Sequence, residues 1–563
     1  MSDSNQLHGV GASPGIAVGP VVTAATTAVT LDALDDPIAA ITASAGRVSE
    51  KLASLSADAK SAGRDEAGDV LGAQALMAED DMIIDAVSEQ LEDHDLDTAF
   101  DMAASQLEQM LASIPDPYLS ARAADIGEVM AAIKRDLGGV DSDGISLVEP
   151  SILVAEELTA AETAGLDTDM VLGFATVTGG ATSHVAIIAR SLGVPAVVGV
   201  EGLLDAPMDR AAFDGSTGEF HASPDEAVEA DFAERVATQA ALNERLAEVH
   251  GAEASLAGKG RIEVAGNVAS PDDIDRAVNV ASDGVGLFRT EFLFLDTPKP
   301  PTEEEQYEIY ARAAKSWTDT VVIRTFDIGG DKPAEYLELP EEENPFLGLR
   351  GVRIYEQFNN LLDDQLRASL RAAAHGKVAV MVPMVATLDE FFLVRDRMAA
   401  VKESLAADGI EHGSVELGVM VEVPSVALIA PSFAEHVDFF SIGTNDLTQY
   451  TMAADRLLGS LSALHDPLHP AVLRLCAMVA DAAATKGQSV SVCGLAAADP
   501  LAAVIFASIG INKLSVSANA VNLIKATLNA QDASIADRVV EVLSKASNAA
   551  EVREGLEPHL VRP

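Results

Sequence analysis

From Gly260 onward, short apolar β-type runs alternate with longer stretches of helical character. Eight such runs occur, each separated from the next by enough residues for a helix: RIEVAGN, GVGLFRTEF, TVVIRTFDI, KVAVMVPMV, LGVMVEVPS, DFFSIGTND, SVSVCGL and KLSVSANAV. Neighbouring parallel strands need a crossover connection, which is usually a helix. This order therefore predicts a (β/α)8 barrel of the TIM type, which we place at residues 256–563.

Polar residues follow the apolar bodies of these runs. In barrels of this type, active groups lie at the C-terminal ends of the strands. The polar residues at or just beyond those ends are Asn267, Arg289, Arg324, Glu422, Asn445, Asp446 and Cys493. Packing alone does not explain apolar strands with reactive tips, so we expect an active site at this end of the barrel.

Several arginines occur among these tips. Arg289 in GLFRTEFLF and Arg324 in IRTFDIGGDKP are suited to clamp a phosphate and a carboxylate through two-pronged hydrogen bonds. Arg350 and Arg353, in ENPFLGLRGVRI, add to a positive mouth. A lone arginine is usually a surface ion-pair partner. Several together in so acidic a chain indicate a small polyanionic ligand.

Two carboxylates and one thiol complete the predicted mouth. Glu422 in MVEVPS and Asp446 in GTNDLTQY offer oxygen ligands of the kind that Mg²⁺ prefers. The alternative to a shared metal site is that the two carboxylates are separate and that each acts only as a cap. Cys493 in SVCGLAAAD ends the seventh run. Buried cysteines are mostly inert, but this position favours an acid/base role.

The N-terminal half has a different organisation. Residues 6–23 predict a strand, a turn and a second strand, and β-type runs return after Gly144 as SILVAEE, MVLGFAT and PAVVGV. The intervening segment is rich in Ala, Leu, Glu and Asp at helical spacing, interrupted by Pro115 and Pro117. We therefore predict a β/α domain in two segments, residues 1–30 and 141–224. A helical bundle, residues 31–140, is inserted into it, and a linker helix follows at residues 225–255.

A histidine lies in the segment TGGATSHVAIIARSLGVPAVVG. Gly179 and Gly180 permit a tight loop, and Thr182 and Ser183 are good helix caps, so His184 falls in the first turn of a helix. A helix N-terminus disfavours imidazolium and favours an anion. Most lone histidines in helices are structural, but here each neighbour has a physical role, which predicts a nucleophile that accepts phosphate.

The net charge of −51 excludes nucleic acid as a partner, because phosphate recognition needs a basic surface. The carboxylates are spread along the whole chain, which favours a surface adapted to high salt, where the Debye length falls to about 3 Å.

We find no transmembrane run and no signal peptide, and so expect a cytoplasmic protein. The two cysteines, Cys476 and Cys493, lie on different predicted elements, which excludes a disulfide framework.

Two apparent motifs carry no site. His465 and His469 in LHDPLHPAVLRL have HxxxH spacing, but Pro467 and Pro470 make this segment a turn before a helix and a poor zinc site. GVGLFRT lacks the full glycine fingerprint of a dinucleotide site.

The motifs together resemble the Enzyme I family of the phosphoenolpyruvate-dependent sugar phosphotransferase system. The resemblance covers nearly the whole chain in one order and is carried by ASPGIAVG, GGATSHVAIIARSLGVPAVVG, GLFRTEFLF, RTFDIGGDKP, ENPFLGLRGVRI, VMVEVPS and SIGTNDLTQYTMAADR. The GGxTSH and GTNDLTQY elements are shared only with related enzymes such as pyruvate phosphate dikinase and phosphoenolpyruvate synthase.

The resemblance implies specific roles. His184 would be the phosphorylated histidine, and Cys493 would protonate the enolate carbon. Glu422 and Asp446 would hold Mg²⁺, and the groups that bind phosphoenolpyruvate would be Arg289, Arg324, Asn445, Asp446 and Arg456, with Arg350 nearby. It also implies that the helical domain docks the phosphocarrier protein HPr and that the barrel forms a homodimer. Because His184 must serve both the barrel and the carrier, we expect its domain to swivel about the linker.

The chain departs from the family pattern at two places. CGLAAAD stands where CGELAGD is usual, and Ala181 stands where an arginine is common. Two alternatives remain: an enzyme like pyruvate or water dikinases without its ATP domain, and a non-catalytic regulator. No glycine-rich nucleotide loop precedes the histidine motif, and a regulator would be expected to lose His184 or the carboxylates.

Overall fold

The computed structural model describes residues 6–24, 29–61, 64–113, 123–139, 147–180, 183–205, 208–295, 297–330, 334, 336–337, 339–340 and 342–563. The chain divides into two compact units, residues 1–240 and 241–563. Each unit has its own sheet and its own core.

The second unit is a closed barrel of eight parallel strands. The strands pair in chain order from β11 to β17, and β10 pairs with both β17 and β11, which closes the ring. All eight β-type runs of the sequence form these strands, so the predicted (β/α)8 barrel is confirmed. A short extra strand, β9, pairs antiparallel with β10. The strands are β9 (Ala254–Leu256), β10 (Gly260–Val268), β11 (Val285–Phe288), β12 (Val321–Arg324), β13 (Val378–Val382), β14 (Val415–Val421), β15 (Phe439–Ile442), β16 (Ser489–Val492) and β17 (Lys513–Val516).

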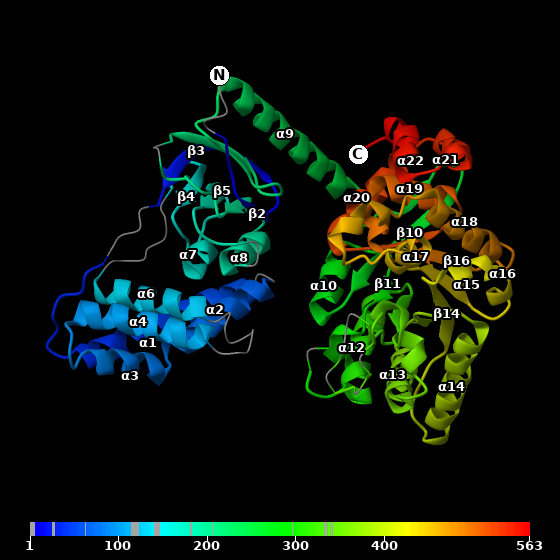
Figure 1. The fold of residues 1–563 in the computed structure, drawn as a ribbon, viewed down its shortest axis with the longest axis horizontal. Coiled ribbons are helices and arrows are strands. Elements are labelled where there is room, and N and C mark those ends of the chain that lie inside the picture. Colours follow the sequence, from blue (N-terminus) through cyan, green and yellow to red (C-terminus); the bar gives the residue numbers. More distant parts are fainter. Residues whose placement is uncertain are drawn as a thin grey trace. The chain divides into compact units, whose positions relative to one another are not determined.

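Helices surround this barrel (Figure 1). Several begin with side-chain caps, such as Ser270 before α10, Thr302 before α12 and Thr387 before α14. The helices are α10 (Pro271–Asn279), α11 (Phe292–Leu295), α12 (Glu303–Ser316), α13 (Asn359–Ala372), α14 (Leu388–Ala407), α15 (Pro424–Leu428), α16 (Ala430–Phe433), α17 (Thr444–Met452), α18 (Pro470–Ala484), α19 (Pro500–Ser508), α20 (Val521–Ala530), α21 (Ser534–Lys545) and α22 (Ala549–Leu556).

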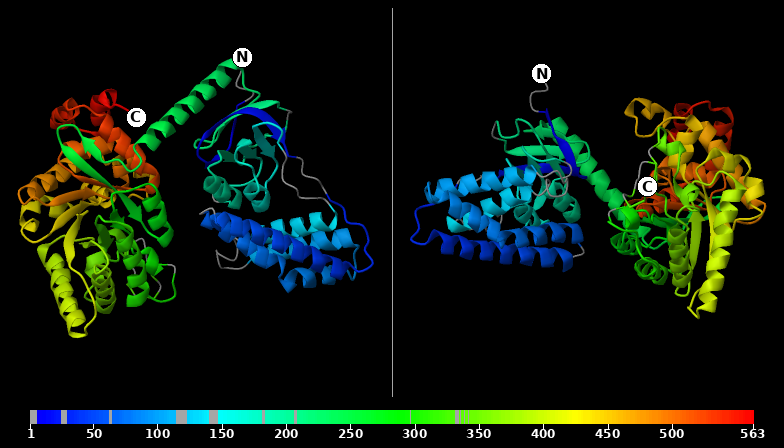
Figure 2. Two further views of the ribbon diagram at one scale, coloured as in Figure 1. Left: turned by 180° about the vertical axis from the view of Figure 1, so that it is seen from behind. Right: turned by 60° about the horizontal axis from the view of Figure 1, so that its bottom comes forward.

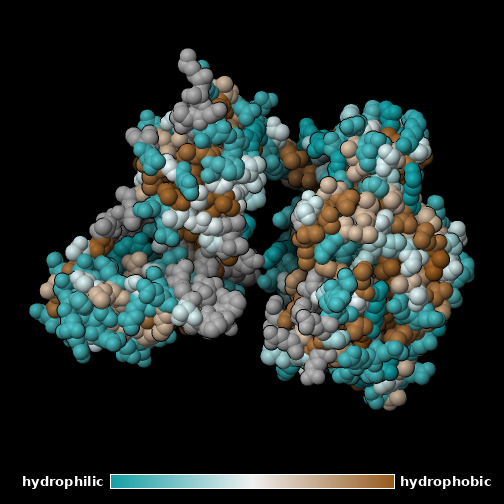
Figure 3. Space-filling view, viewed as in Figure 1, coloured by the Kyte–Doolittle hydropathy of each residue, from teal (hydrophilic) through white to brown (hydrophobic). Residues whose placement is uncertain are grey.

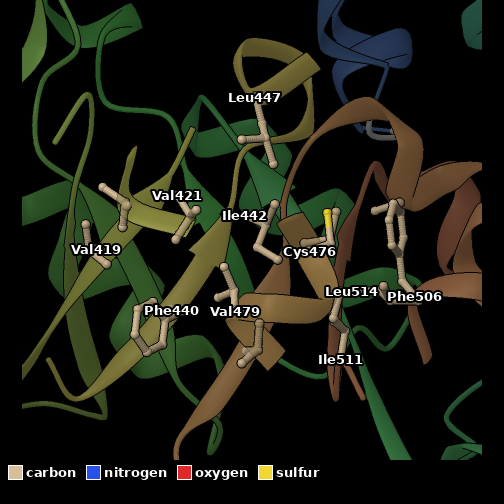
Figure 4. Close-up of a cluster of buried hydrophobic side chains, with 14 of the residues drawn as sticks. Val419, Val421, Phe440, Ile442, Leu447, Cys476, Val479, Phe506, Ile511 and Leu514 are labelled. Carbon is tan, nitrogen blue, oxygen red and sulfur yellow. The ribbon is translucent and has the colours of Figure 1, made fainter. Parts of the chain in front are cut away.

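The main core lies between the strands and these helices. Figure 4 shows Phe440 and Ile442 of β15 near Cys476 and Val479 of α18, and all four side chains are buried. Cys476 is therefore a packing residue, and burial raises the pKa of its thiol to about 12. Apolar strands covered by apolar helix faces explain the near-continuous hydrophobic runs of the sequence.

The first unit contains a mixed sheet of eight strands in the order β1-β8-β7-β3-β4-β5-β6-β2. Strands β3 to β6 are parallel, and the outer strands pair antiparallel. The hairpin of β7 and β8 was not predicted from the sequence, because both strands are short and each begins with a charged residue. The strands are β1 (Gln6–His8), β2 (Val10–Ser13), β3 (Ile16–Thr23), β4 (Ser151–Ala155), β5 (Val171–Thr176), β6 (Ala196–Val198), β7 (Arg210–Asp214) and β8 (Glu219–Ala222).

The first unit also contains a bundle of long helices (Figure 2). Two helices of the β/α part pack on this bundle, and Ala160 of α7 and Ile188 of α8 belong to its buried core. Pro115 and Pro117 lie outside the described residues. The helices are α1 (Pro37–Ser61), α2 (Asp65–Ala78), α3 (Asp81–Gln90), α4 (Leu96–Ala112), α6 (Ala123–Leu137), α7 (Ala160–Ala164) and α8 (His184–Leu192).

Helix α9 (Glu226–Glu248) carries the chain past the boundary between the units, and Phe232 is its single buried residue. Hydrophilic residues also cover most of the helical bundle on the face shown in Figure 3. Within the described residues, no helix combines the length and the apolar character that crossing a membrane requires.

Candidate active site

A cavity of about 510 Å³ lies at the C-terminal ends of the barrel strands. Its wall includes most of the predicted site residues, which come from segments far apart in the sequence: Arg289, Arg324, Glu422, Asn445, Asp446, Arg456 and Cys493. Asn267 is instead hydrogen-bonded to Ser515, whose hydroxyl donates to Oδ1 of Asn267 at 2.6 Å. The parallel closure of the barrel brings the strand ends together, as the barrel rule predicts.

Arg324 ends β12 and is 6% exposed. Its Nη2 donates to Oε1 of Glu291 at 2.5 Å, and its Nη1 lies 3.3 Å from Oδ2 of Asp327. Burial by itself would lower the pKa of this guanidinium, but the neighbouring carboxylates raise it well above its ordinary value. Arg324 is therefore a permanent cation in the cavity wall.

Arg350 lies behind that wall and is 1% exposed. It donates to both oxygens of Asp327, from Nη2 at 2.7 Å and from Nε at 3.2 Å, and its Nη1 lies 3.5 Å from Asp446. Arg353, which the sequence placed at the same mouth, instead donates to the backbone carbonyls of Leu347 and Gly348. Of the two arginines, only Arg350 contacts groups of the site.

The other two arginines face the cavity under different constraints. Within the described residues, Arg289 has no carboxylate at ion-pair distance, so its charge is available to an anion. Arg456 has Nη1 3.4 Å from Asp446, and its guanidinium lies 5.5 Å from the ring centre of Phe346. Among the described residues of the wall, Arg289 therefore has no carboxylate at ion-pair distance. The charges of Arg324 and Arg456 are balanced by neighbouring carboxylates.

Glu422 and Asp446 both line the cavity, and their negative charges oppose each other. Glu422 directly follows β14, and its Oε1 accepts the backbone N–H of Met384 at 2.5 Å. Burial, followed by the charges of Asp446 and Asp327, raises the pKa of Glu422. A site that disfavours its own negative charge in this way is suited to a cation, and two carboxylate oxygen donors fit Mg²⁺. Among the described residues, no group of three or more His, Cys, Asp or Glu side chains forms a metal cluster.

Helix α17 begins at the cavity, with Thr444, Asn445 and Asp446 in its first turn. No side chain caps its N-terminus, which favours an anion there. The loop after β16 approaches it closely: Leu495 N–H donates to Asn445 Oδ1 at 3.1 Å, and a Cβ on Gly494 would lie 1.9 Å from Thr444 Oγ1. Only glycine permits this approach.

Cys493 follows β16 and is 2% exposed. Its sulfur accepts a hydrogen bond from the Ser441 hydroxyl at 3.2 Å, and Ser491 in turn donates to Ser441 at 2.8 Å. Burial raises the pKa of the thiol to about 11, although Ser441 and the nearby Arg324 oppose the shift. The thiol is therefore protonated near neutral pH and lies in the cavity wall.

His184 is the first residue of α8, in the first unit. The Ser183 side chain caps the helix by accepting from Ala186 N–H at 3.3 Å, and Gly179 has φ = 105°, which favours glycine. The predicted position of His184 in a first helical turn is confirmed. Its side chain, Ala181 and Thr182 lie outside what the structure describes.

Comparisons with protein-family models and with related proteins identify the kind of protein to which these features belong. The model of the PEP-utilising enzyme, PEP-binding domain, matches residues 243–533, and those of the mobile and N-terminal domains match residues 147–218 and 8–122. A phosphoenolpyruvate-protein phosphotransferase of Geobacillus stearothermophilus is 37% identical over 561 residues, which cover 97% of this chain and 96% of the relative. One of Haloferax volcanii is 41% identical over 509 residues, which cover 88% of this chain and 87% of the relative. The chain belongs to the phosphoenolpyruvate-protein phosphotransferase family.

Membership of the phosphoenolpyruvate-protein phosphotransferase family confirms the resemblance expected from the motifs, and the chain is an enzyme of the PEP-utilising class. A third relative in this family, from Staphylococcus carnosus, is 35% identical over 558 residues, which cover 96% of this chain and 97% of the relative. The similarity therefore extends over both units and is not limited to the barrel.

Sequence reasoning missed several residues that line the cavity, among them Glu291, Asp327, His465 and Leu495. The first two were visible in FRTEF and RTFD, where a carboxylate follows each arginine by two or three residues. His465 was considered only as a zinc ligand; its Nε2 lies 2.9 Å from the carbonyl oxygen of Asp455. Leu495 is 72% exposed and offers an apolar rim to the cavity.

Proposed function

We propose that this chain transfers the phosphoryl group of phosphoenolpyruvate to His184, releases pyruvate, and passes the group to a histidine of the phosphocarrier protein HPr. The observation that carries the proposal is one cavity wall that combines arginines, a carboxylate pair and a protonated thiol. Such a set matches the substrate, which has a phosphate, a carboxylate and an enol carbon that needs a proton. The chain would in this way drive sugar uptake.

The cations would orient the substrate. Arg289 and Arg324 would hold the phosphate, because a guanidinium fork matches its oxygens. Asn445, Arg456 and the N-terminus of α17 would hold the carboxylate on the opposite side. Arg350 would act from behind the wall, since it does not line the cavity.

Glu422 and Asp446 would hold Mg²⁺. When bound, the ion would supply positive charge to the substrate oxygens. Glu422 directly follows β14, and Asp446 lies in the first turn of α17 just beyond β15, at the end of the barrel where catalytic groups lie. Their mutual repulsion in the absence of a cation supports this role.

Cys493 would complete the reaction. Attack of the His184 nitrogen on phosphorus breaks the bond to the enol oxygen, and the enolate keeps that electron pair. The C3 carbon of the enolate then takes the proton of the Cys493 thiol, the C2–O bond becomes a carbonyl, and sulfur keeps the electrons of the S–H bond. Arg324 and the Ser441 hydroxyl are placed to stabilise the resulting thiolate.

The units would divide these tasks. We assign residues 1–30 and 141–224 to the phosphohistidine domain, 31–140 to carrier binding, 225–255 to the linker and 256–563 to substrate binding and dimerisation. In-line transfer needs the histidine nitrogen roughly 3 Å from phosphorus. The same nitrogen must then reach a second protein, so the phosphohistidine domain would swivel about α9. We also expect a cytoplasmic, salt-adapted homodimer.

The deciding experiment is incubation of the protein with ³²P-labelled phosphoenolpyruvate and Mg²⁺ in the absence of ATP. We expect acid-labile label on the protein and release of pyruvate. A dikinase-like enzyme would instead take label from γ- or β-labelled ATP, and a non-catalytic regulator would take none. Either of these results would refute the proposal.

A further inference from the structure

Asp327 lies between two buried guanidinium groups. It follows β12 by three residues and is 1% exposed. Its Oδ2 accepts from Arg350 Nη2 at 2.7 Å and lies 3.3 Å from Arg324 Nη1, while its Oδ1 accepts from Arg350 Nε at 3.2 Å. One carboxylate therefore contacts both arginines, and both of its oxygens are used.

These contacts belong to a longer row of alternating charges in the cavity wall and behind it. In order, the row is Glu291, Arg324, Asp327, Arg350, Asp446 and Arg456. Asp327 is its centre, because it links the end of β12 with the first turn of α17. Through Arg350, which reaches Asp446 at 3.5 Å, it connects a proposed phosphate clamp to a proposed metal ligand.

The buried position makes these contacts rigid. Long arginine side chains in water sample many rotamers, but a carboxylate that accepts two hydrogen bonds from one guanidinium fixes its plane as well as its position. A buried charge also needs a partner, so neither Arg324 nor Arg350 can leave Asp327 without cost. The site is thus arranged before a substrate arrives, which is the condition for efficient electrostatic catalysis.

We propose that Asp327 is a positioning residue: it holds Arg324 directly, and Asp446 through Arg350, in the arrangement that receives phosphoenolpyruvate. This inference rests on the proposed function of the same cavity. A different role, in which Asp327 only balances charge, has the opposite consequence. Removing its charge would then make the cavity more positive and strengthen the binding of an anion.

The test is Asp327→Asn, which keeps the shape but leaves one acceptor oxygen for two arginines. Single-turnover labelling is measured against phosphoenolpyruvate concentration, which separates the half-saturating concentration from the limiting rate. We expect the half-saturating concentration to rise at least about tenfold, because a lost charged hydrogen bond weakens the clamp, with a smaller fall in the limiting rate. An unchanged or lower half-saturating concentration overturns the proposal.

Glu303 provides a matched control. It also bridges two arginines, accepting from Arg367 Nε and Arg371 Nη1, each at 2.6 Å, but it does not line the cavity. We expect Glu303→Gln to leave the half-saturating concentration unchanged. An equal rise in Glu303→Gln would mean that any lost carboxylate bridge has this effect, and it would overturn the assignment to Asp327.

A second variant covers the case in which Asp327→Asn does not fold. Arg350→Lys keeps the positive charge, but one ammonium cannot reproduce the fork on Asp327 and the contact with Asp446. Because Arg350 does not line the cavity, a rise in the half-saturating concentration must pass through those contacts, and no rise overturns the proposal. The wild-type protein distinguishes failure of the proposed function from failure of the role of Asp327. If the wild type takes no label, the proposed function is wrong. If the wild type is labelled and the variants behave like it, only the role of Asp327 is refuted.

Discussion

The hydroxyl of Ser441 donates a hydrogen bond to the sulfur of Cys493 at 3.2 Å, and both side chains are buried at the end of the barrel interior. Ser491 supports this contact by donating to Ser441 at 2.8 Å. A donor aimed at sulfur stabilises a thiolate more than a thiol. The contact is therefore placed to stabilise the species that remains after Cys493 gives up its proton.

Ser441→Ala should raise the pKa of the Cys493 thiol above its value of about 11, because the thiolate loses a hydrogen bond. At any pH below that pKa the thiolate fraction falls, by about fivefold for a hydrogen bond worth about 1 kcal/mol. The measurement is the rate of alkylation of Cys493 by iodoacetamide between pH 8 and 10, followed by peptide mass spectrometry. Ser515→Ala, which removes a buried hydroxyl from the neighbouring strand, should leave the rate unchanged; equal rates in wild type and Ser441→Ala would contradict the prediction.

His184→Ala should abolish labelling by phosphoenolpyruvate, because no other group would accept the phosphoryl group. Binding of phosphoenolpyruvate, measured by calorimetry with Mg²⁺, should persist, since the proposed clamp belongs to the other unit. His221→Ala is the control, because His221 lies in the same unit on β8, 2.8 Å from Glu219. Acid-labile phosphate on the His184→Ala protein would disprove the assignment of the nucleophile.

Glu422→Gln should lower Mg²⁺-dependent labelling by more than about a hundredfold, since even outer partners of metal ligands cost 10- to 100-fold. Glu416→Gln, at the exposed start of the same strand, should retain normal labelling. If Glu422→Gln kept normal Mg²⁺ dependence, the carboxylate pair would not be the metal site. We expect the same loss in Asp446→Asn.

The metal-free protein should also show a pH-dependent stability that depends on Glu422. Its pKa is raised in the folded state, so its contribution to stability is fully present below the unfolded pKa of about 4.3 and is lost as pH rises through the folded pKa. Wild-type Tm should therefore fall more than that of Glu422→Gln between pH 5 and 9. Parallel Tm curves for the two proteins would show that the carboxylate is not penalised by burial.

The net charge of −51 should make the protein unstable at low salt, because like charges repel over a Debye length of about 10 Å at 0.1 M. We expect Tm to rise steadily between 0.1 and 2 M KCl as screening shortens that length. Sucrose is the control, since it stabilises by exclusion from the surface without screening charge. Full stability without added salt would refute the adaptation to high salt.

Local sequence signals predicted much of the architecture. The eight apolar runs became the eight barrel strands, and the predicted helix of the histidine motif begins at His184 with Ser183 as its cap. Strand periodicity, helix caps and turns depend on residues close together in the chain, so these features are readable without a structure. The hairpin of β7 and β8 was not predicted, because its two short strands show no clear hydrophobic pattern.

The partners of the site residues depended on the tertiary structure. Arg324 meets Glu291 across 33 positions, Cys493 meets Ser441 across 52, and Arg350 meets Asp446 across 96. The sequence also placed Arg353 at the mouth, whereas the structure turns it toward the carbonyls of its own loop.

The sequence by itself determined the kind of barrel, the order of its strands and the identity of most groups at their ends, because each depends on short-range patterns. Only the tertiary structure decided that Asp327 bridges two arginines, that Arg350 lies behind the wall and that Ser441 contacts the thiol. Those contacts are set by how the ring of strands closes and by the register of each parallel pair, and no local pattern encodes which side chains that closure brings together.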